Sequence, residues 1–203
     1  MCGILAIYSK NKTLKFSKKT ITNALKKMKH RGPDKLSCII DSGIVLGHVR
    51  LDIIDSAGGG QPFIKDKKEL IFNGEIYNYR ELKKKINKQT KFKSQSDTEV
   101  LFEVLNQYGD DGLRLLNGDW AFALYDRNEH TLIVSRDRFG AKPLYEYRTS
   151  EFTAYSSEIK VLLELFKDEI VPDLNTIQNY LLNSCGAEFK ETWFKGVHRF
   201  PMS

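Results

Sequence analysis

The residue with the clearest chemical potential is a cysteine next to the start of the chain. Cys2 carries a thiol and, if Met1 is removed, also a free α-amino group. An α-amine titrates near ~7.7–8.0 and a thiol near ~8.5, so the amine can take the thiol proton at neutral pH. Nucleophile and base then belong to one residue, the N-terminal form of the nucleophile-and-base arrangement. An early cysteine without any chemistry is the alternative reading.

The bulk composition predicts one large globular domain, or a domain with a short extension. Of the 203 residues, 41% are hydrophobic and 29% are charged, a balance that excludes an intrinsically disordered chain. No apolar run approaches the roughly 18 residues of a membrane span, and the N-terminus lacks the apolar core of a signal peptide. We therefore expect a cytoplasmic protein with no membrane partner.

The charged and metal-binding residue types indicate neither a nucleic-acid site nor a metal site. The formal net charge is +6, but the lysines are scattered over predicted helices without interleaved aromatic residues, which is typical of a solvated face. The three cysteines are widely spaced and form no CxxC pair, which argues against a disulfide framework and a zinc site. His30 and His48 have no third ligand at a suitable spacing. We expect no metal and no nucleic-acid partner.

Hydrophobic periodicity and turn residues divide the chain into short elements. The predicted strands lie at residues 2–7, 36–40, 44–50, 69–72, 120–126, 131–136, 144–148 and 152–156. The predicted helices lie at residues 17–28, 79–86, 100–108, 157–166 and 174–181, with a capping box at 96–99 before the third. Residues 58–62 predict a loop, and Asn73-Gly74 predicts a turn. Because helices separate groups of hairpin-linked strands, antiparallel sheets covered by helices are favoured over a doubly wound parallel sheet.

Several short segments, taken in their order along the chain, resemble one family. These segments are Cys2-Gly3-Ile4, His30–Asp34, Gly47–Leu51, Asn73–Asn78, Ser96-Asp97, Arg136-Asp137, Gly140, Lys142–Tyr145 and Ser157–Lys160. They resemble the N-terminal glutaminase domain of class II glutamine amidotransferases, and within that class the glutamine-hydrolysing asparagine synthetases. Each motif alone is modest, but their common order over nearly the whole chain is specific.

This resemblance implies a fold and a domain organisation. The implied fold is α+β, a four-layer α/β/β/α sandwich of two antiparallel sheets of the N-terminal nucleophile hydrolase type. Residues 1–185 would form the glutaminase domain, and residues 186–203 the start of a linker to a C-terminal synthetase domain. The chain departs from the family pattern at Ala6 (usually Gly), Trp120 (usually Phe) and Met202-Ser203 (usually Pro-Gly). None of these positions is an expected site residue.

The resemblance also implies the catalytic residues. Cys2 is the expected nucleophile, and the side-chain amide of Asn73 with the backbone N–H of Gly74 forms the expected oxyanion hole. An asparagine amide has two donors, and glycine lets the backbone approach a reacting carbon closely. Without the resemblance, Asn73-Gly74 would be read as a turn only.

A free amino-acid substrate has a carboxylate and an ammonium group, and each needs a partner. Arg50 is the candidate for the carboxylate because a guanidinium matches it bidentately. Glu75 and Asp97 are the candidates for the ammonium. Backbone groups of the segment that includes Leu51, Ile53 and Ile54 are expected to assist. Two alternatives remain open, since Arg50 could be a surface ion-pair partner and Asp97 could serve only the helix N-terminus.

The implied reaction is hydrolysis of glutamine to glutamate and ammonia, which supplies ATP-dependent asparagine synthesis from aspartate. ATP and magnesium belong to the synthetase domain, and none is expected in this one. The expected partners are glutamine and the synthetase domain, with a homodimer left open. Two alternatives are an amidotransferase domain for another carboxylate acceptor, such as a sugar acid, and a non-catalytic scaffold domain. Retention of Met1 would favour the scaffold, because Cys2 would then have no free amine.

Overall fold

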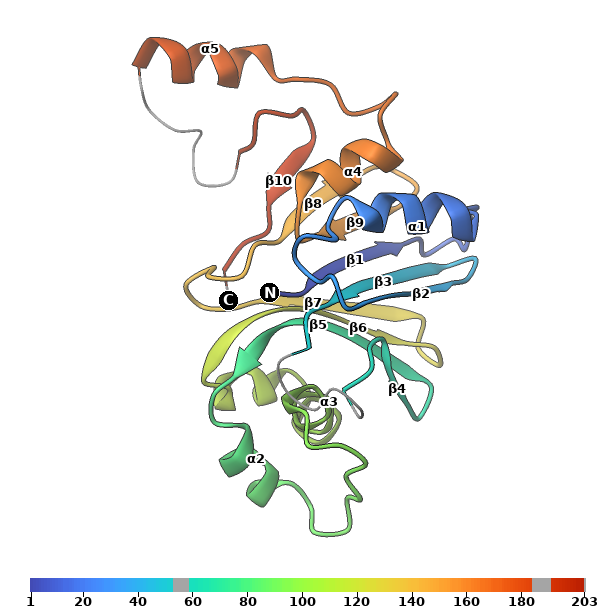
Figure 1. The fold of residues 1–203 in the computed structure, drawn as a ribbon, viewed down its shortest axis with the longest axis vertical. Helices are drawn as coiled ribbons and strands as arrows, with labels where there is room; N and C mark the ends of the chain where they lie inside the picture. The colour runs from blue at the N-terminus through green and yellow to red at the C-terminus, as the bar shows by residue number, and fades with distance from the viewer. Residues whose placement is uncertain (53–58, 184–190, 203) are drawn as a thin grey trace.

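Two antiparallel β-sheets face each other in the computed structural model, which describes residues 1–52, 59–183 and 191–202 (Figure 1). In spatial order, the first sheet consists of β10 (Val197–Arg199), β8 (Tyr145–Arg148), β9 (Thr153–Ser156), β1 (Gly3–Tyr8), β3 (Ile44–Arg50) and β2 (Lys35–Ile40). The second consists of β4 (Phe63–Lys65), β5 (Lys68–Ile76), β6 (Gly118–Asp126) and β7 (Thr131–Arg136). The chain begins at one end of the layer between the two sheets, just before β1 (Figure 1).

Helices cover the outer face of each sheet, so the molecule has four layers (Figure 1). On the six-stranded sheet lie α1 (Lys18–Lys26) and α4 (Ile159–Leu165). On the four-stranded sheet lie α2 (Tyr79–Lys85) and α3 (Asp97–Tyr108), followed by the 3-10 helix η1 (Gly109–Leu115). The last helix, α5 (Leu174–Asn183), lies beyond α4. This arrangement confirms the expected α/β/β/α sandwich.

Three apolar clusters hold the layers together, and the alternation of side chains along each strand decides which cluster a residue joins. In β1, Leu5 packs toward the helices α1 and α4, whereas Ile4 packs toward the other sheet. In β5, Phe72 packs toward α3, whereas Ile71 packs toward the first sheet. A slip of one residue would exchange these faces, so the burial of both faces fixes the register of the central strands.

The structure corrects the predicted turn at Asn73-Gly74. The predicted strand at residues 69–72 continues through both residues to Ile76, and Gly74 pairs with Trp120 of β6. Pairing with a neighbouring strand therefore overrides the turn preference of the dipeptide. The strands β4 and β10 were not predicted, because three residues are too few to show a period. Although residues 197–199 lie in the expected linker, β10 pairs with β8.

The start of α3 matches half of the predicted capping box. The Ser96 hydroxyl accepts a hydrogen bond from the backbone N–H of Thr98, as an N-cap does (3.2 Å). The other half of the predicted box, in which the Glu99 carboxylate would accept from the backbone N–H of Ser96, is wrong. Instead, the Glu99 carboxylate accepts from the backbone N–H groups of Lys93 and Ser94 (2.9 and 2.7 Å). Glu99 thereby fastens the preceding loop to the helix end.

Candidate active site

The thiol of Cys2 lies where the chain enters β1. Because side chains alternate along a strand, Cys2 shares the side of Ile4, which faces the second sheet. Its sulfur lies 3.4 Å from the backbone nitrogen of Leu51, just beyond the end of β3. Its carbonyl oxygen accepts a hydrogen bond from Nε of Arg31 (2.9 Å). Two segments distant in sequence therefore hold this residue in place.

The surroundings of Cys2 determine which form of the thiol is present. Burial raises the pKa of the Cys2 thiol above its ordinary value, because a thiolate loses hydration there. The Leu51 N–H and the positive charges of the chain terminus, Arg50 and Arg31 act in the opposite direction but do not reverse the shift. The thiol is therefore protonated at neutral pH, and a nucleophilic attack by its sulfur requires a nearby base.

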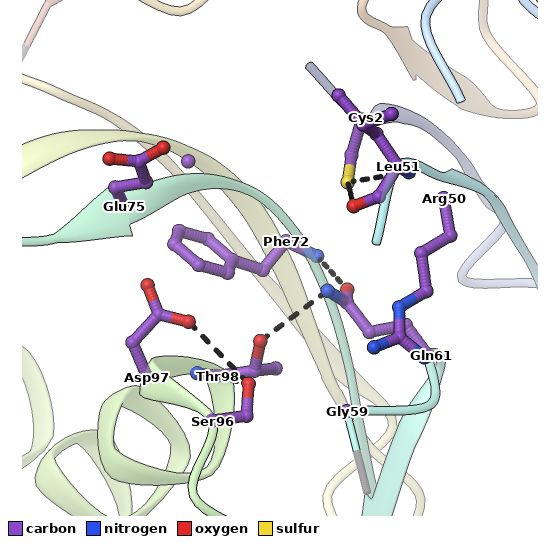
Figure 2. A pocket seen from close by; sticks show the side chains of 11 residues that line it. Cys2, Arg50, Leu51, Gly59, Gln61, Phe72, Glu75, Ser96, Asp97 and Thr98 are labelled. Atoms are coloured by element: carbon purple, nitrogen blue, oxygen red, sulfur yellow. Dashed lines mark hydrogen bonds between the residues drawn. The ribbon is translucent and has the colours of Figure 1, made fainter. Parts of the chain in front are cut away.

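A pocket opens beside the Cys2 sulfur (Figure 2). Its walls come from the chain start, the end of β3, the segment before β4, β5 and the start of α3. The lining residues are Cys2, Arg50, Leu51, Gly59, Gln61, Phe72, Gly74, Glu75, Ser96, Asp97 and Thr98. Six of the residues that the sequence indicated therefore lie together: Cys2, Arg50, Leu51, Gly74, Glu75 and Asp97. Ile53 and Ile54 lie outside the described residues.

Asn73 does not line this pocket but lies directly beside it. It sits in β5 between Phe72 and Gly74, so its side chain leaves the strand on the opposite face. That face is shared with Ile71 and is directed at the sheet that carries Cys2. The side chain is buried, and its Nδ2 has no hydrogen-bond partner among the described residues. A buried amide donor without a partner is rare in proteins and calls for an explanation.

The backbone N–H of Gly74 points toward the pocket side of β5. Alternate N–H groups of a strand point the same way. Those of Phe72 and Ile76 donate to Gln61 Oε1 (2.6 Å) and to Asp97 Oδ2 (3.0 Å), away from β6. The N–H of Gly74, which lies between them, shares their direction. The glycine itself is required by the neighbouring strand, because a Cβ at Gly74 would lie 2.2 Å from the carbonyl oxygen of Asp119.

The charged residues of the pocket lie in two groups (Figure 2). Arg50 is buried beside Cys2, and its Nε pairs with Asp52 (2.5 Å). Glu75 and Asp97 lie across the pocket from Cys2. Burial raises the pKa of Asp97, and the negative charge of Glu75 adds to that effect, although backbone N–H groups oppose it. A cation bound beside these two carboxylates would offset the unfavourable effect of Glu75 on the charge of Asp97.

Sequence reasoning did not identify Gln61 as part of the site. This residue is buried, and its amide accepts from the Phe72 backbone and donates from Nε2 to the Thr98 hydroxyl (3.4 Å). It therefore connects β5 to the start of α3 in the wall of the pocket. In the sequence it stands between glycines and a proline, which indicates a loop and nothing about its contacts.

The two histidines considered as ligands have other contacts. His30 pairs with Glu158 through Nε2 (2.8 Å), and His48 bonds to the Phe72 carbonyl oxygen (3.2 Å). Within the described ranges, no three His, Cys, Asp or Glu side chains are grouped so that they could hold a metal ion. The described helices are also all too short or too polar to cross a membrane.

Comparison with known protein families agrees with this geometry. A family model described as "Glutamine amidotransferase domain" matches residues 1–203. The chain belongs to this family. The resemblance inferred from the sequence motifs is thereby confirmed at the level of the family.

Curated relatives support the narrower resemblance. The chain is similar to asparagine synthetase [glutamine-hydrolyzing] 1 of Bacillus subtilis, with 34% identity over 89% of this chain and 29% of that protein. Asparagine synthetase [glutamine-hydrolyzing] 1 of Arabidopsis thaliana is 35% identical over 71% of this chain and 25% of that protein. The corresponding enzyme of Zea mays is 35% identical over 80% of this chain and 28% of that protein. The chain thus spans less than a third of the length of each of these relatives.

Solved structures show the same fold at lower identity. The glutamine phosphoribosylpyrophosphate amidotransferase of Bacillus subtilis is 21% identical, with a TM-score of 0.65 over 81% of this chain and 43% of that one. A structure titled as the allosteric regulatory enzyme of purine biosynthesis is 22% identical, with a TM-score of 0.63 over the same shares, 81% and 43%. These likenesses confirm the expected fold of two antiparallel sheets between two layers of helices.

Proposed function

We propose that this chain hydrolyses glutamine to glutamate and ammonia with Cys2 as the nucleophile. The observation that supports this most directly is the pocket that combines a thiol with a buried guanidinium and two carboxylates. An α-amino acid presents one carboxylate and one ammonium group, and these charges suit such a lining. Its side-chain carboxamide is then the group available to the thiol.

The proposed reaction has two steps, formation of a thioester and its hydrolysis. The Cys2 α-amine, exposed by removal of Met1, takes the thiol proton, and the sulfur attacks the δ-carbon of glutamine. The proton passes to the amide nitrogen and the C–N bond breaks. Ammonia leaves, and the glutamyl group remains bound to Cys2 as a thioester. Water then attacks the thioester, which gives glutamate and restores the thiol. The raised pKa of the buried thiol is the reason that a base so close to the sulfur is needed.

The oxyanion of each tetrahedral intermediate accepts hydrogen bonds from Asn73 and Gly74. The Nδ2 of Asn73, which has no hydrogen-bond partner in the described part of the chain, and the pocket-directed N–H of Gly74 support this assignment. Both donors belong to β5, whose backbone is held by β6 on one edge and by the side chains of Gln61 and Asp97 on the other, so they are fixed before the substrate binds. Donors that are oriented in advance contribute most to catalysis, and one of them is typically worth about 2.7–4 kcal/mol.

The substrate's α-carboxylate pairs with Arg50, and its ammonium group pairs with Asp97 and Glu75. A guanidinium carries five N–H donors, so it can serve Asp52 and a substrate carboxylate together. The backbone of the segment that starts at Leu51 assists at the carboxylate end. A site that depends on several buried polar contacts rejects analogues that lack one of the matching groups.

For the whole protein we propose glutamine-dependent asparagine synthesis. The support is the similarity to relatives named as glutamine-hydrolyzing asparagine synthetases, each more than three times as long as the matched segment. In this proposal a C-terminal synthetase domain binds ATP and magnesium and activates aspartate. The ammonia released at Cys2 is its nitrogen source.

The decisive experiment is a glutaminase assay on three purified proteins, each checked by intact mass for removal of Met1. These are the wild type, Cys2→Ala and Cys38→Ala. Cys38 is a matched control because it is also a free cysteine, half-buried in β2 of the same sheet. We expect glutamate release from wild type and Cys38→Ala, and none above background from Cys2→Ala.

Two outcomes would contradict the proposal. Undiminished glutamate release by Cys2→Ala would exclude this thiol as the nucleophile. An inactive wild type that keeps Met1 would favour the non-catalytic scaffold instead.

A further inference from the structure

The edge of β5 next to the pocket is completed by side chains. On that edge β4 pairs with β5 only from Lys68 to Leu70. Two residues further on, the Phe72 N–H donates to the side chain of Gln61 (2.6 Å). The carbonyl oxygen of the same residue lies 3.2 Å from Nε2 of His48. One carboxamide and one imidazole therefore take the two bonds that a neighbouring strand would make in a ladder.

His48 reaches Phe72 from the opposite sheet. It lies in β3, pairs across the strands with Ile4, and is completely buried. A carbonyl oxygen can only accept, so the imidazole must carry its proton on Nε2. Burial lowers the pKa of His48 to about 4, which keeps the ring neutral at pH 7. The ring thus connects β3, which pairs with β1, to β5, which carries the proposed oxyanion donors.

We infer that His48 is a positioning residue for glutamine hydrolysis, which fixes the peptide between Phe72 and Asn73 so that the Asn73 amide and the Gly74 N–H face the Cys2 sulfur. The inference rests on the proposed function. The carbonyl that His48 binds belongs to the very peptide group whose nitrogen is that of Asn73. A shift of that peptide would displace both donors relative to the sulfur, and misplacement by about 1 Å can cost on the order of 10²-fold in rate.

A purely structural role for His48 predicts something different. A buried histidine that only fills space would affect the free energy of unfolding and leave the chemistry of the folded protein unchanged. If His48 positions the peptide, loss of its hydrogen bond to the Phe72 carbonyl oxygen should instead lower kcat. Substrate capture by Arg50 and Asp97 does not depend on the Phe72 carbonyl, so KM for glutamine should stay nearly constant.

The test compares three replacements of His48 in the same chain. His48→Gln keeps an N–H donor near the position of Nε2, whereas His48→Leu removes it at similar volume. His48→Asn keeps an amide that is too short to reach the same place, and it serves if the leucine variant does not fold. We expect kcat to fall about 10–100-fold for Leu and Asn, and to be largely restored for Gln.

Two further measurements separate positioning from general damage. The rate of Cys2 alkylation by iodoacetamide requires no oxyanion hole and should match that of wild type in all three variants. In an Asn73→Ala background, His48→Leu should cost much less than in wild type, because residues acting through one another are not additive.

The possible results decide the inference separately from the proposed function. A wild type that is alkylated at Cys2 but releases no glutamate would contradict the proposed function itself. With an active wild type, an unchanged kcat in folded His48→Leu or His48→Asn would overturn only the positioning role. The positioning role would also be overturned if the activation free energies lost in the two single variants added fully in His48→Leu with Asn73→Ala. A His48→Gln variant that does not restore kcat would overturn it as well.

Discussion

The layer between the two sheets has an apolar half and a polar half, and both halves are built from the same strands. In β3, the side chains that face the other sheet are first Ile44 and Leu46 and then His48 and Arg50. In β5 the change occurs between Ile71 and Asn73. In β1 it occurs between Ile4 and the cysteine before the strand. The strands therefore pass from core to site within a single step of two residues.

The two halves contribute oppositely to stability. In the apolar half each buried side chain loses contact with water, which favours the folded state. In the polar half, Nδ2 of Asn73 and Nδ1 of His48 are buried without partners among the described residues. Each such atom costs about 1–3 kcal/mol. The site is therefore a destabilised end of this layer, and the apolar end supplies the compensating stability.

Removing the Asn73 amide should separate the two properties most clearly. For Asn73→Ala we expect kcat to fall by about 10²–10³, since one oxyanion donor is lost. The free energy of unfolding should not decrease, because the substitution removes a buried donor that has no partner in the ranges the structure describes. Glutamate release and urea denaturation measure the two effects. The exposed Asn117, replaced by alanine, is the control. An unchanged kcat in Asn73→Ala would show that this amide plays no part in the reaction.

A smaller effect is expected from Asp97→Asn, on KM instead of kcat. The amide oxygen can still accept from the Ile76 N–H, but the charge for the substrate ammonium is lost. We expect KM for glutamine to rise about 10–100-fold, since a hydrogen bond to a charged group is worth about 1.5–3 kcal/mol. Asp119→Asn is the matched control, because Asp119 bonds to Tyr77 and lies outside the pocket lining.

The pH dependence of KM tests the same assignment. Burial raises the pKa of Asp97, so the ionised form that binds ammonium is lost at a higher pH than for an ordinary aspartate. In wild type, KM should therefore rise as the pH falls through this raised pKa. In Asp97→Asn the KM should show no such rise. Parallel pH profiles for the two proteins would contradict the role of Asp97 in ammonium binding.

The fold could be anticipated from the sequence because its signals are local or shared by a family. The apolar run after Cys2 and the hairpin before Arg50 are visible as periods and turn residues, and they coincide with β1 and with β2 and β3. The turn predicted at Asn73-Gly74 was wrong because a dipeptide preference cannot show that β6 lies alongside. The site residues could be named only through the resemblance.

Other features of the site depend on distances that no sequence period encodes. The contact of Gln61 with Phe72 requires β4 to stop pairing at Leu70, which depends on where a three-residue strand ends. The contact of His48 with the same residue joins two sheets, so neither strand alone indicates it. The sequence shows that one face of β3 carries two apolar and then two polar residues. It does not show that β5 lies opposite this face.

The smallest expected effect concerns the apolar half alone. Ile71→Val removes one buried methylene two residues before Asn73, on the same face of β5. We expect the free energy of unfolding to drop by about 0.5–1.5 kcal/mol in urea denaturation. The kcat of the folded protein should not change, because the backbone bonds of Phe72 to His48 and Gln61 separate the cavity from the proposed oxyanion donors. A parallel fall of kcat would show instead that packing at Ile71 positions Asn73, so that the apolar and polar halves of the layer are not independent.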